Sequence, residues 1–128
     1  MIISTLTGLL ISGGGDYMEP EASVEVFFPS TGQSCSLPSL PDDRYEHTMD
    51  NLLICGGNNS DTSCLTFTSG EWVMSHTLVH RRVAHASWQT EDGRMVLMGG
   101  SYSIDTTETI NLAGEQGEPS FDTQYTLV

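Results

Sequence analysis

Short apolar segments alternate with polar turns along the whole chain, and no window has the three-to-four-residue apolar spacing of an amphipathic helix. Residues 24–28 alternate in the manner of a half-buried strand and stop before Pro29. The pattern predicts an all-β fold with short strands at residues 9–11, 24–28, 35–37, 47–49, 52–55, 64–67, 72–74, 86–88, 95–98, 109–112 and 121–125, and with an inner strand supplied by residues 1–7.

Three of these strands end in similar hexapeptides. Residues 9–14 read LLISGG, residues 52–57 read LLICGG and residues 95–100 read MVLMGG, so the diglycines begin at positions 13, 56 and 99 with equal intervals of 43. A second motif, Arg-x-x-His, occurs at Arg44 with His47 and again 38 residues later at Arg82 with His85. Aligning the first unit with the second places Met1 where this motif would have its Arg. The chain is therefore predicted to contain three repeats, each a four-stranded sheet.

The repeated residues have a structural interpretation of their own. A glycine pair at the end of a buried strand allows a sharp bend or the close approach of a neighbouring segment. Trp72 is large enough to fill the space between adjacent sheets. We expect the Arg-x-x-His pairs to join one sheet to the next through backbone carbonyls or a carboxylate such as Glu108. The glycines assigned to this role are Gly13, Gly14, Gly56, Gly57, Gly99 and Gly100.

These features resemble the kelch repeats of β-propellers, over nearly the whole chain. In the second unit the diglycine is followed by an aromatic residue near a strand end (Phe67), a turn at Ser69 and Gly70, and the outer-strand Trp72. The chain departs from the pattern at Cys35 and Phe121, which take the Trp position in the first and third units. The resemblance implies a partial kelch β-propeller of about three four-stranded antiparallel blades, at residues 1–43, 44–81 and 82–128.

A ring of three blades would be incomplete, because typical propellers have four to eight. The first and last sheets of a repeat array need a cap or a neighbour to cover their apolar faces. We therefore expect either a piece of a longer propeller or self-association, in which two copies complete a six-bladed ring.

Charge narrows the classes of partner. The chain has 17 Asp and Glu against four positive residues, all Arg, and a net charge of −13. Such a balance repels nucleic acids and anionic membranes. The apolar runs are shorter than the roughly 18 residues of a membrane span, and the apolar start lacks the basic region of a signal peptide. We expect no nucleic-acid partner and no membrane insertion, and both the cytoplasm and a secreted location stay open.

Candidate chemistry is sparse. The four histidines (His47, His76, His80 and His85) are interpreted as structural, and neither a nucleophile elbow nor a lysine-bearing phosphate loop occurs. We predict no catalytic residue, no metal site and no cofactor. A disulfide between Cys55 and Cys64 is left open against three small half-buried thiols, with Cys35 free or paired outside the chain. Asn58 begins an N-glycosylation tripeptide, which matters only in a secreted chain.

The resemblance implies a non-enzymatic protein-interaction module that binds through loops on one face, with a neutral or basic partner because the chain is acidic. One alternative is a fragment of a propeller enzyme, of galactose-oxidase-like or glycan-processing type. Another is an architectural repeat of a secreted or surface protein. The candidate binding residues are Asp42, Asp43, Arg44, Asn58, Asn59, Arg81, Arg82 and Tyr102.

Overall fold

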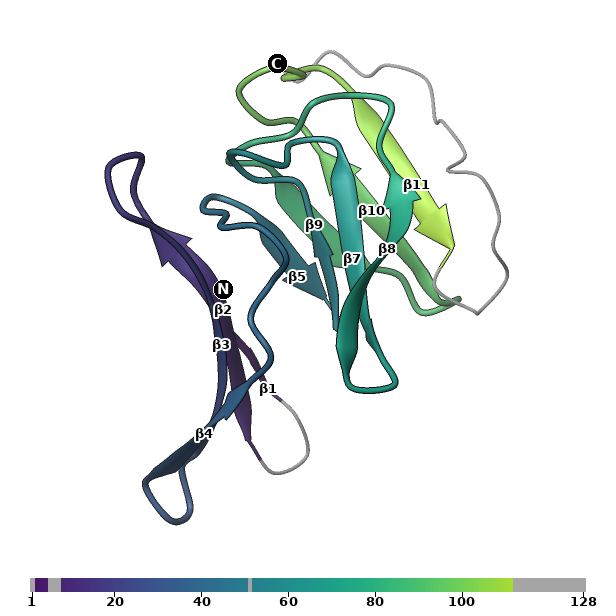
Figure 1. Cartoon of the computed structure of the whole chain (residues 1–128). Helices are drawn as coiled ribbons and strands as arrows, with labels where there is room; N and C mark the ends of the chain where they lie inside the picture. The colour runs from purple at the N-terminus through teal and green to yellow at the C-terminus, as the bar shows by residue number, and fades with distance from the viewer. Residues whose placement is uncertain (1, 5–7, 51, 112–128) are drawn as a thin grey trace.

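The computed structural model describes residues 2–4, 8–50 and 52–111, and within them the chain forms eleven strands and no helix. This confirms the all-β prediction. The strands form three antiparallel sheets in which each strand pairs with its neighbours in sequence (Figure 1).

Each sheet corresponds to one repeat. The first contains β1 (Ile2–Ser4), β2 (Leu9–Gly15), β3 (Pro20–Phe28) and β4 (Gln33–Leu37). The second contains β5 (Thr48–Asp50), β6 (Leu53–Cys55), β7 (Ser63–Thr68) and β8 (Glu71–Thr77). The third contains β9 (Ala86–Gln89), β10 (Arg94–Met98) and β11 (Thr107–Asn111). The strand expected at residues 121–125 lies outside the described residues.

The first unit departs from the expected strand ends. β2 does not stop at its diglycine but continues to Gly15, because β3 begins early enough to pair Pro20 with Gly15 and Glu21 with Gly14. The register shifts between Ser12 and Gly14, so the strand is irregular where the glycines begin. β8 is also longer than the predicted 72–74, and its pairing with β7 shifts between Cys64 and Leu65.

Two apolar clusters hold the three sheets together. The first joins the first and second sheets, and the second joins the second and third sheets. Because side chains alternate along a strand, neighbouring residues of β6 serve different clusters. Ile54 packs against the first sheet, and Leu53 packs toward the third. The buried members are Leu10, Val24, Leu40, Met49, Ile54, Leu65 and Trp72 in the first cluster, and Leu53, Cys55, Cys64, Leu78, Met95, Leu97 and Ile110 in the second.

Trp72 occupies the space between the first and second sheets. Its ring centroid lies 5.0 Å from that of Phe67, and its indole Nε1 donates a hydrogen bond to the Pro38 carbonyl oxygen at 2.9 Å. A buried indole thus has a partner for its one polar group while its ring packs on the first sheet.

The first strands of the three sheets lie next to one another. β5 contacts both β1 and β9, and Ser87 Oγ on β9 donates a hydrogen bond to Asp50 Oδ2 on β5 at 3.2 Å. The sheets are therefore arranged like blades, with the turns of all three units gathered at the same ends (Figure 1).

Candidate functional site

The loops of the three units meet at one end of the molecule, the upper end in Figure 1. Backbone hydrogen bonds join them in a chain, in which Asn58 N donates to Tyr45 O, Arg82 N to Asp61 O, and Ser101 N to Val83 O, at 2.8 to 2.9 Å. We call this surface the loop face, and define it as residues 13–19, 38–47, 56–62, 78–85 and 99–106.

Arg44 fixes the middle of the loop face from inside. Its side chain is fully buried, and Nη1 donates to the carbonyl oxygens of Gly56 and Ser63, each at 3.2 Å. Nη2 donates to both carboxylate oxygens of Asp42 at 3.1 Å and to Ser63 Oγ at 3.0 Å. Burial lowers the pKa of Arg44, and the charge of Asp42 opposes that change. The guanidinium thereby ties both ends of the β6–β7 loop to the segment that precedes β5.

Arg82 repeats this arrangement in the third unit. It is also fully buried, and its Nη1 donates to the Gly99 carbonyl oxygen at 2.7 Å and to the Thr106 carbonyl oxygen at 3.2 Å. Its negative partner is Glu108, whose Oε1 lies 3.7 Å from Nη2 and also accepts a hydrogen bond from His80 N at 2.6 Å. Glu108 therefore holds both the buried Arg and the segment that enters the third sheet.

The direction of these contacts corrects one expectation. Each Arg side chain binds within its own unit. Arg44 and Arg82 donate to carbonyl oxygens at the ends of the loop between the second and third strand of the sheet that follows them in sequence, and not to any described residue of the preceding sheet. The contact with the preceding sheet comes instead from the main chain and from the His. Gly14 N donates to Arg44 O at 3.0 Å and Gly57 N to Arg82 O at 2.9 Å.

The histidines complete the contact with the preceding sheet. His47 Nε2 shares a hydrogen bond with Ser12 Oγ at 3.0 Å, and His85 Nε2 shares one with Thr48 Oγ1 at 2.8 Å. Burial is the main cause that lowers the pKa of each imidazole to about 4, and the positive charge of the neighbouring Arg44 or Arg82 contributes to this lowering. Both histidines are therefore neutral near pH 7, and each joins two sheets.

The first glycine of the first and second diglycines, Gly13 and Gly56, provides the room for this contact. A Cβ on Gly13 would lie 2.6 Å from Arg44 O and 2.9 Å from His47 Cε1, and a Cβ on Gly56 would lie 2.5 Å from Arg82 O and 2.8 Å from His85 Cε1. The two motifs found in the sequence are thus two halves of one contact between sheets.

The outer surface of the loop face has a second cluster, around Tyr102. The guanidinium carbon of Arg81 lies 4.0 Å from the centroid of the Tyr102 ring, and Arg81 Nε donates to Asp61 Oδ2 at 2.6 Å. Hydrogen bonding to Asp61 is the main cause of a raised pKa of Arg81. The contact between Arg81 and Tyr102 links the second and third units, and both side chains are more than half exposed.

Tyr45 lies in the middle of the loop face, half-buried between the units. Desolvation raises the pKa of its phenol, and the negative charges of Glu46 and Asp16 raise it further, whereas the Asn58 side chain opposes them. Tyr45 is not among the candidate residues predicted from the sequence. Its position inside the Arg-x-x-His segment, between Arg44 and His47, is the signal that could have indicated it.

Exposed apolar side chains gather at the loop tips. They include two residues of the β2–β3 loop and two of the β10–β11 loop, and of these four only Tyr102 is among the candidate binding residues named from the sequence. The signal in each case is a large apolar residue in a polar, turn-forming segment. The four are Tyr17, Met18, Tyr102 and Ile104.

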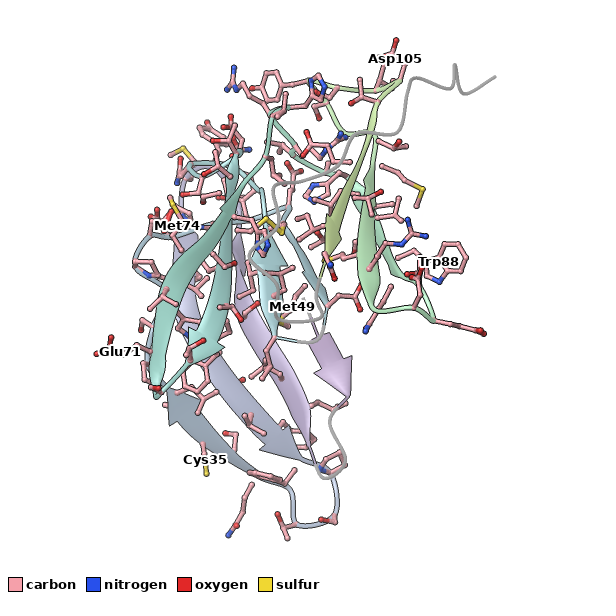
Figure 2. The ribbon with its side chains drawn as sticks, turned by 90° about the vertical axis from the view of Figure 1, so that its right-hand side faces the viewer. Cys35, Met49, Glu71, Met74, Trp88 and Asp105 are labelled. Carbon is pink, nitrogen blue, oxygen red and sulfur yellow. A yellow bond between two sulfur atoms is a disulfide. The ribbon has the colours of Figure 1, made fainter. Side chains whose placement is uncertain are left out.

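Carboxylates surround these apolar tips. Seven Asp and Glu fall in the segments of the loop face, whereas of its three Arg only Arg81 is exposed. Figure 2 shows one of the carboxylates, Asp105, at the tip of the β10–β11 loop. The carboxylates are Asp16, Glu19, Asp42, Asp43, Glu46, Asp61 and Asp105.

Several predicted binding residues do have the surface position expected of them. Asp43 accepts a hydrogen bond from Asn59 Nδ2 at 3.0 Å, and Asn58, Arg81 and Tyr102 lie on the same face. Arg44 and Arg82 are a correction, because full burial removes them from contact with any partner.

The structure joins Cys55 and Cys64 by a disulfide, the pair that the sequence left open. The two residues are direct partners across β6 and β7, and the bridge closes the base of the loop that Arg44 binds. Cys35 is an exposed free thiol on β4, at the opposite end from Asp105 (Figure 2).

Within the described residues, no three His, Cys, Asp or Glu side chains form a group that could hold a metal ion. No helix in that part of the chain is long and apolar enough to cross a membrane. No family model matches the sequence, and no curated protein is significantly similar to it.

Proposed function

We propose that this chain is a non-enzymatic protein-interaction module of kelch-repeat type that binds a neutral or basic partner through its loop face. The observation that carries the proposal is the composition of that face, in which exposed apolar side chains stand among seven carboxylates on a buried framework. Aromatic residues and Met are enriched where proteins bind one another. A framework held by Arg44 and Arg82 favours binding, because a rigid loop loses little conformational entropy when a partner docks.

The acidic surroundings determine the kind of partner. A Lys or Arg side chain of a partner would be attracted by the carboxylates, and its attraction would weaken as salt screens the charges. The tyrosines offer ring faces on which a cation can rest, as Arg81 rests on Tyr102 within the chain. We therefore expect a partner segment that combines basic and apolar residues.

The test selects peptides that bind the purified chain from a random displayed library and measures their affinities. Met18→Ala and Tyr102→Ala are expected to weaken the best peptide about tenfold each, the loss typical of a central contact residue. Met74→Ala is the matched control, because Met74 is 63 % exposed on β8 and Met18 is 69 % exposed on the loop face. Its affinity should stay within about twofold.

A second, independent measurement determines the affinities of the same peptides at a series of salt concentrations. We expect the affinity to fall steadily between low and high salt, because exposed charges are screened over about 10 Å at 0.1 M ionic strength. An affinity that is flat across this range, or equal losses from Met18→Ala and Met74→Ala, would contradict the proposal.

A second candidate function is an architectural repeat of a secreted or surface protein, and the Cys55–Cys64 disulfide favours it. Structural disulfides persist mainly in oxidising compartments. Intact-mass analysis of the protein from its native source would show a two-hydrogen loss for the bridge and a glycan at Asn58. A reduced, unglycosylated chain would count against this candidate.

A further inference from the structure

The outer face of the third sheet, which is turned away from the second sheet, is partly open to solvent. Arg94, at the start of β10, is the charged residue of the described strands on this face. Met95 and Leu97 of β10 belong to the second apolar cluster, so Val96 and Met98 on the same strand point to the opposite face. Trp88 pairs directly with Val96 and shares its face. Its side chain is 65 % exposed and projects away from the ribbon in Figure 2.

The same positions in the second sheet are covered. Val96 and Met98 follow Leu53 and Cys55 at the repeat interval of 43 residues. Leu53 and Cys55 are buried against the third sheet. The outer face of the third sheet therefore continues a pattern that, one repeat earlier, is an interface between sheets.

In the described part of the chain, the diglycine of the third unit also lacks the contacts that the diglycines of the first and second units make with the following sheet. Gly14 N and Gly57 N each donate to the carbonyl oxygen of the Arg in the following unit. The equivalent amide, Gly100 N–H, has no acceptor among residues 2–4, 8–50 and 52–111. Among the described residues, a Cβ on Gly99 would meet only Ile104 O at 3.5 Å, in place of the Arg carbonyl and imidazole near Gly13 and Gly56.

We propose that this outer face binds a β-sheet of the same repeat type that is entered through an Arg-x-x-His segment. The carbonyl oxygen of the incoming Arg accepts a hydrogen bond from Gly100 N–H, and the incoming imidazole lies over Gly99. Apolar residues of the incoming sheet cover Trp88, Val96 and Met98. This surface is separate from the loop face and its function.

A second copy of this chain does not offer that chemistry. Its two Arg-x-x-His segments are already engaged, because Arg44 O and Arg82 O accept hydrogen bonds from Gly14 and Gly57. Its first sheet has Met1 and Ser4 at the positions that correspond to Arg44 and His47. The occupant is therefore a different sheet, one that has both side chains of the motif.

The experiment extends the full chain at its C-terminus with a second copy of residues 78–111, which contains the motif. The added copy contains Trp88→Phe, so that the original Trp88 and the buried Trp72 are the only indoles. Tethering raises the effective concentration of the added sheet to about the millimolar range. Acrylamide quenching of the fluorescence is then compared between the extended and original chains.

We expect quenching to fall at least about twofold in the extended chain, because docking removes the exposed indole from solvent. Val96→Asp in the original part should restore the quenching, since a buried unpaired carboxylate opposes docking. The same variant of the unextended chain tests whether the third sheet itself still folds. Unchanged quenching in an extended chain that has gained β-structure by circular dichroism overturns the proposal.

A second measurement decides the case in which the added copy does not fold. A synthetic peptide of residues 79–89, which includes the motif, is titrated against the unextended chain by NMR. A shift of the Gly100 amide resonance supports the proposal, and no shift at millimolar peptide overturns it. Protection of Trp88 that grows with the concentration of the unextended chain alone would assign the face to a second copy and would also overturn it.

Discussion

A guanidinium group removed from water needs acceptors for its N–H groups, and Arg44 has three kinds. Two backbone carbonyls, the Ser63 hydroxyl and the Asp42 carboxylate surround it. When one partner of a buried charged network is removed, the remaining partners are left buried without compensation, and the protein loses much stability. Replacing the whole network by apolar residues usually changes stability far less. The contribution of Arg44 to stability therefore depends on its burial as well as on its charge.

Arg44→Met is therefore expected to lower the free energy of unfolding by about 3 to 5 kcal/mol. The matched control is Arg94→Met, because Arg94 pairs with Asp92 at 3.0 Å while both side chains are about half exposed. Exposed pairs contribute about 0 to 1 kcal/mol. Urea denaturation of the two variants measures the difference, and equal losses would show that Arg44 is not a structural centre.

The two buried histidines predict how stability changes with pH. In the folded chain the pKa of His47 and His85 is lowered from 6.5 to about 4. Below pH 6.5 the unfolded chain therefore binds protons that the folded chain does not, so stability is full above this pH and falls down to about pH 4. The loss is on the order of 3 kcal/mol for each histidine when the pH has fallen through this range.

The double variant His47→Gln with His85→Gln isolates this effect from the carboxylates. Gln keeps a hydrogen-bonding group but does not titrate in this range. Denaturation at a series of pH values should give a shallower fall between pH 6.5 and 4 for the variant than for the original chain. Parallel curves would mean that the histidines do not cause the loss.

At the scale of the strand, the glycine at the end of β6 permits contact between sheets. Gly56 has a φ of +66° and Gly32, in the β3–β4 turn, has a φ of +71°. An Ala at either site is strained by about 1 kcal/mol. A Cβ at Gly56 would also lie 2.5 Å from Arg82 O, whereas the described residues put nothing within 4 Å of a Cβ at Gly32.

Gly56→Ala should consequently cost at least about 2 kcal/mol more than Gly32→Ala, as overpacking of a close contact does. Thermal unfolding followed by circular dichroism compares the two variants. If both lose the same stability, backbone strain alone explains the glycine and the approach of the next unit does not.

Which elements form was predictable from the sequence, because strand positions depend on local pattern. The interval between diglycines and the alternation of residues 24–28 indicated strands that the structure contains in β2, β3, β6 and β10. The direction of each Arg side chain was not predictable, because it depends on how far apart the sheets lie. The continuation of β2 to Gly15 likewise depends on a partner strand that begins at Pro20.

The candidate site divides in the same way. Loops expected to bind do lie together, since consecutive antiparallel strands return the chain to the same end of each sheet. The burial of Arg44 and Arg82 was hidden, because a charged residue in a polar segment has no pattern that distinguishes it from an exposed one. Tyr45 was missed because it lies within the Arg-x-x-His motif, whose residues were interpreted as structural, and was therefore not considered as a surface residue.

At the scale of the whole molecule, the second sheet lies between the two apolar clusters and contributes residues to both. As far as the structure describes the chain, the buried apolar residues of the first sheet belong only to the first cluster, through Leu10 and Val24. Those in the core of the third sheet belong only to the second cluster, through Met95, Leu97 and Ile110. Stability in such an array is approximately a sum of nearest-neighbour terms. Damage at one interface should therefore loosen the sheet beyond it more than the sheet on the far side.

Leu97→Ala and Leu10→Ala test this coupling as mirror images, because both side chains are buried to about the same extent. Each should cost about 2 to 5 kcal/mol as a core cavity. Native-state amide exchange should accelerate mainly in β9–β11 for Leu97→Ala and mainly in β2 and β3 for Leu10→Ala, since local opening follows the weakened interface. Uniform acceleration across all three sheets in both variants would mean that the chain opens as one unit, with its two interfaces fully coupled through β6.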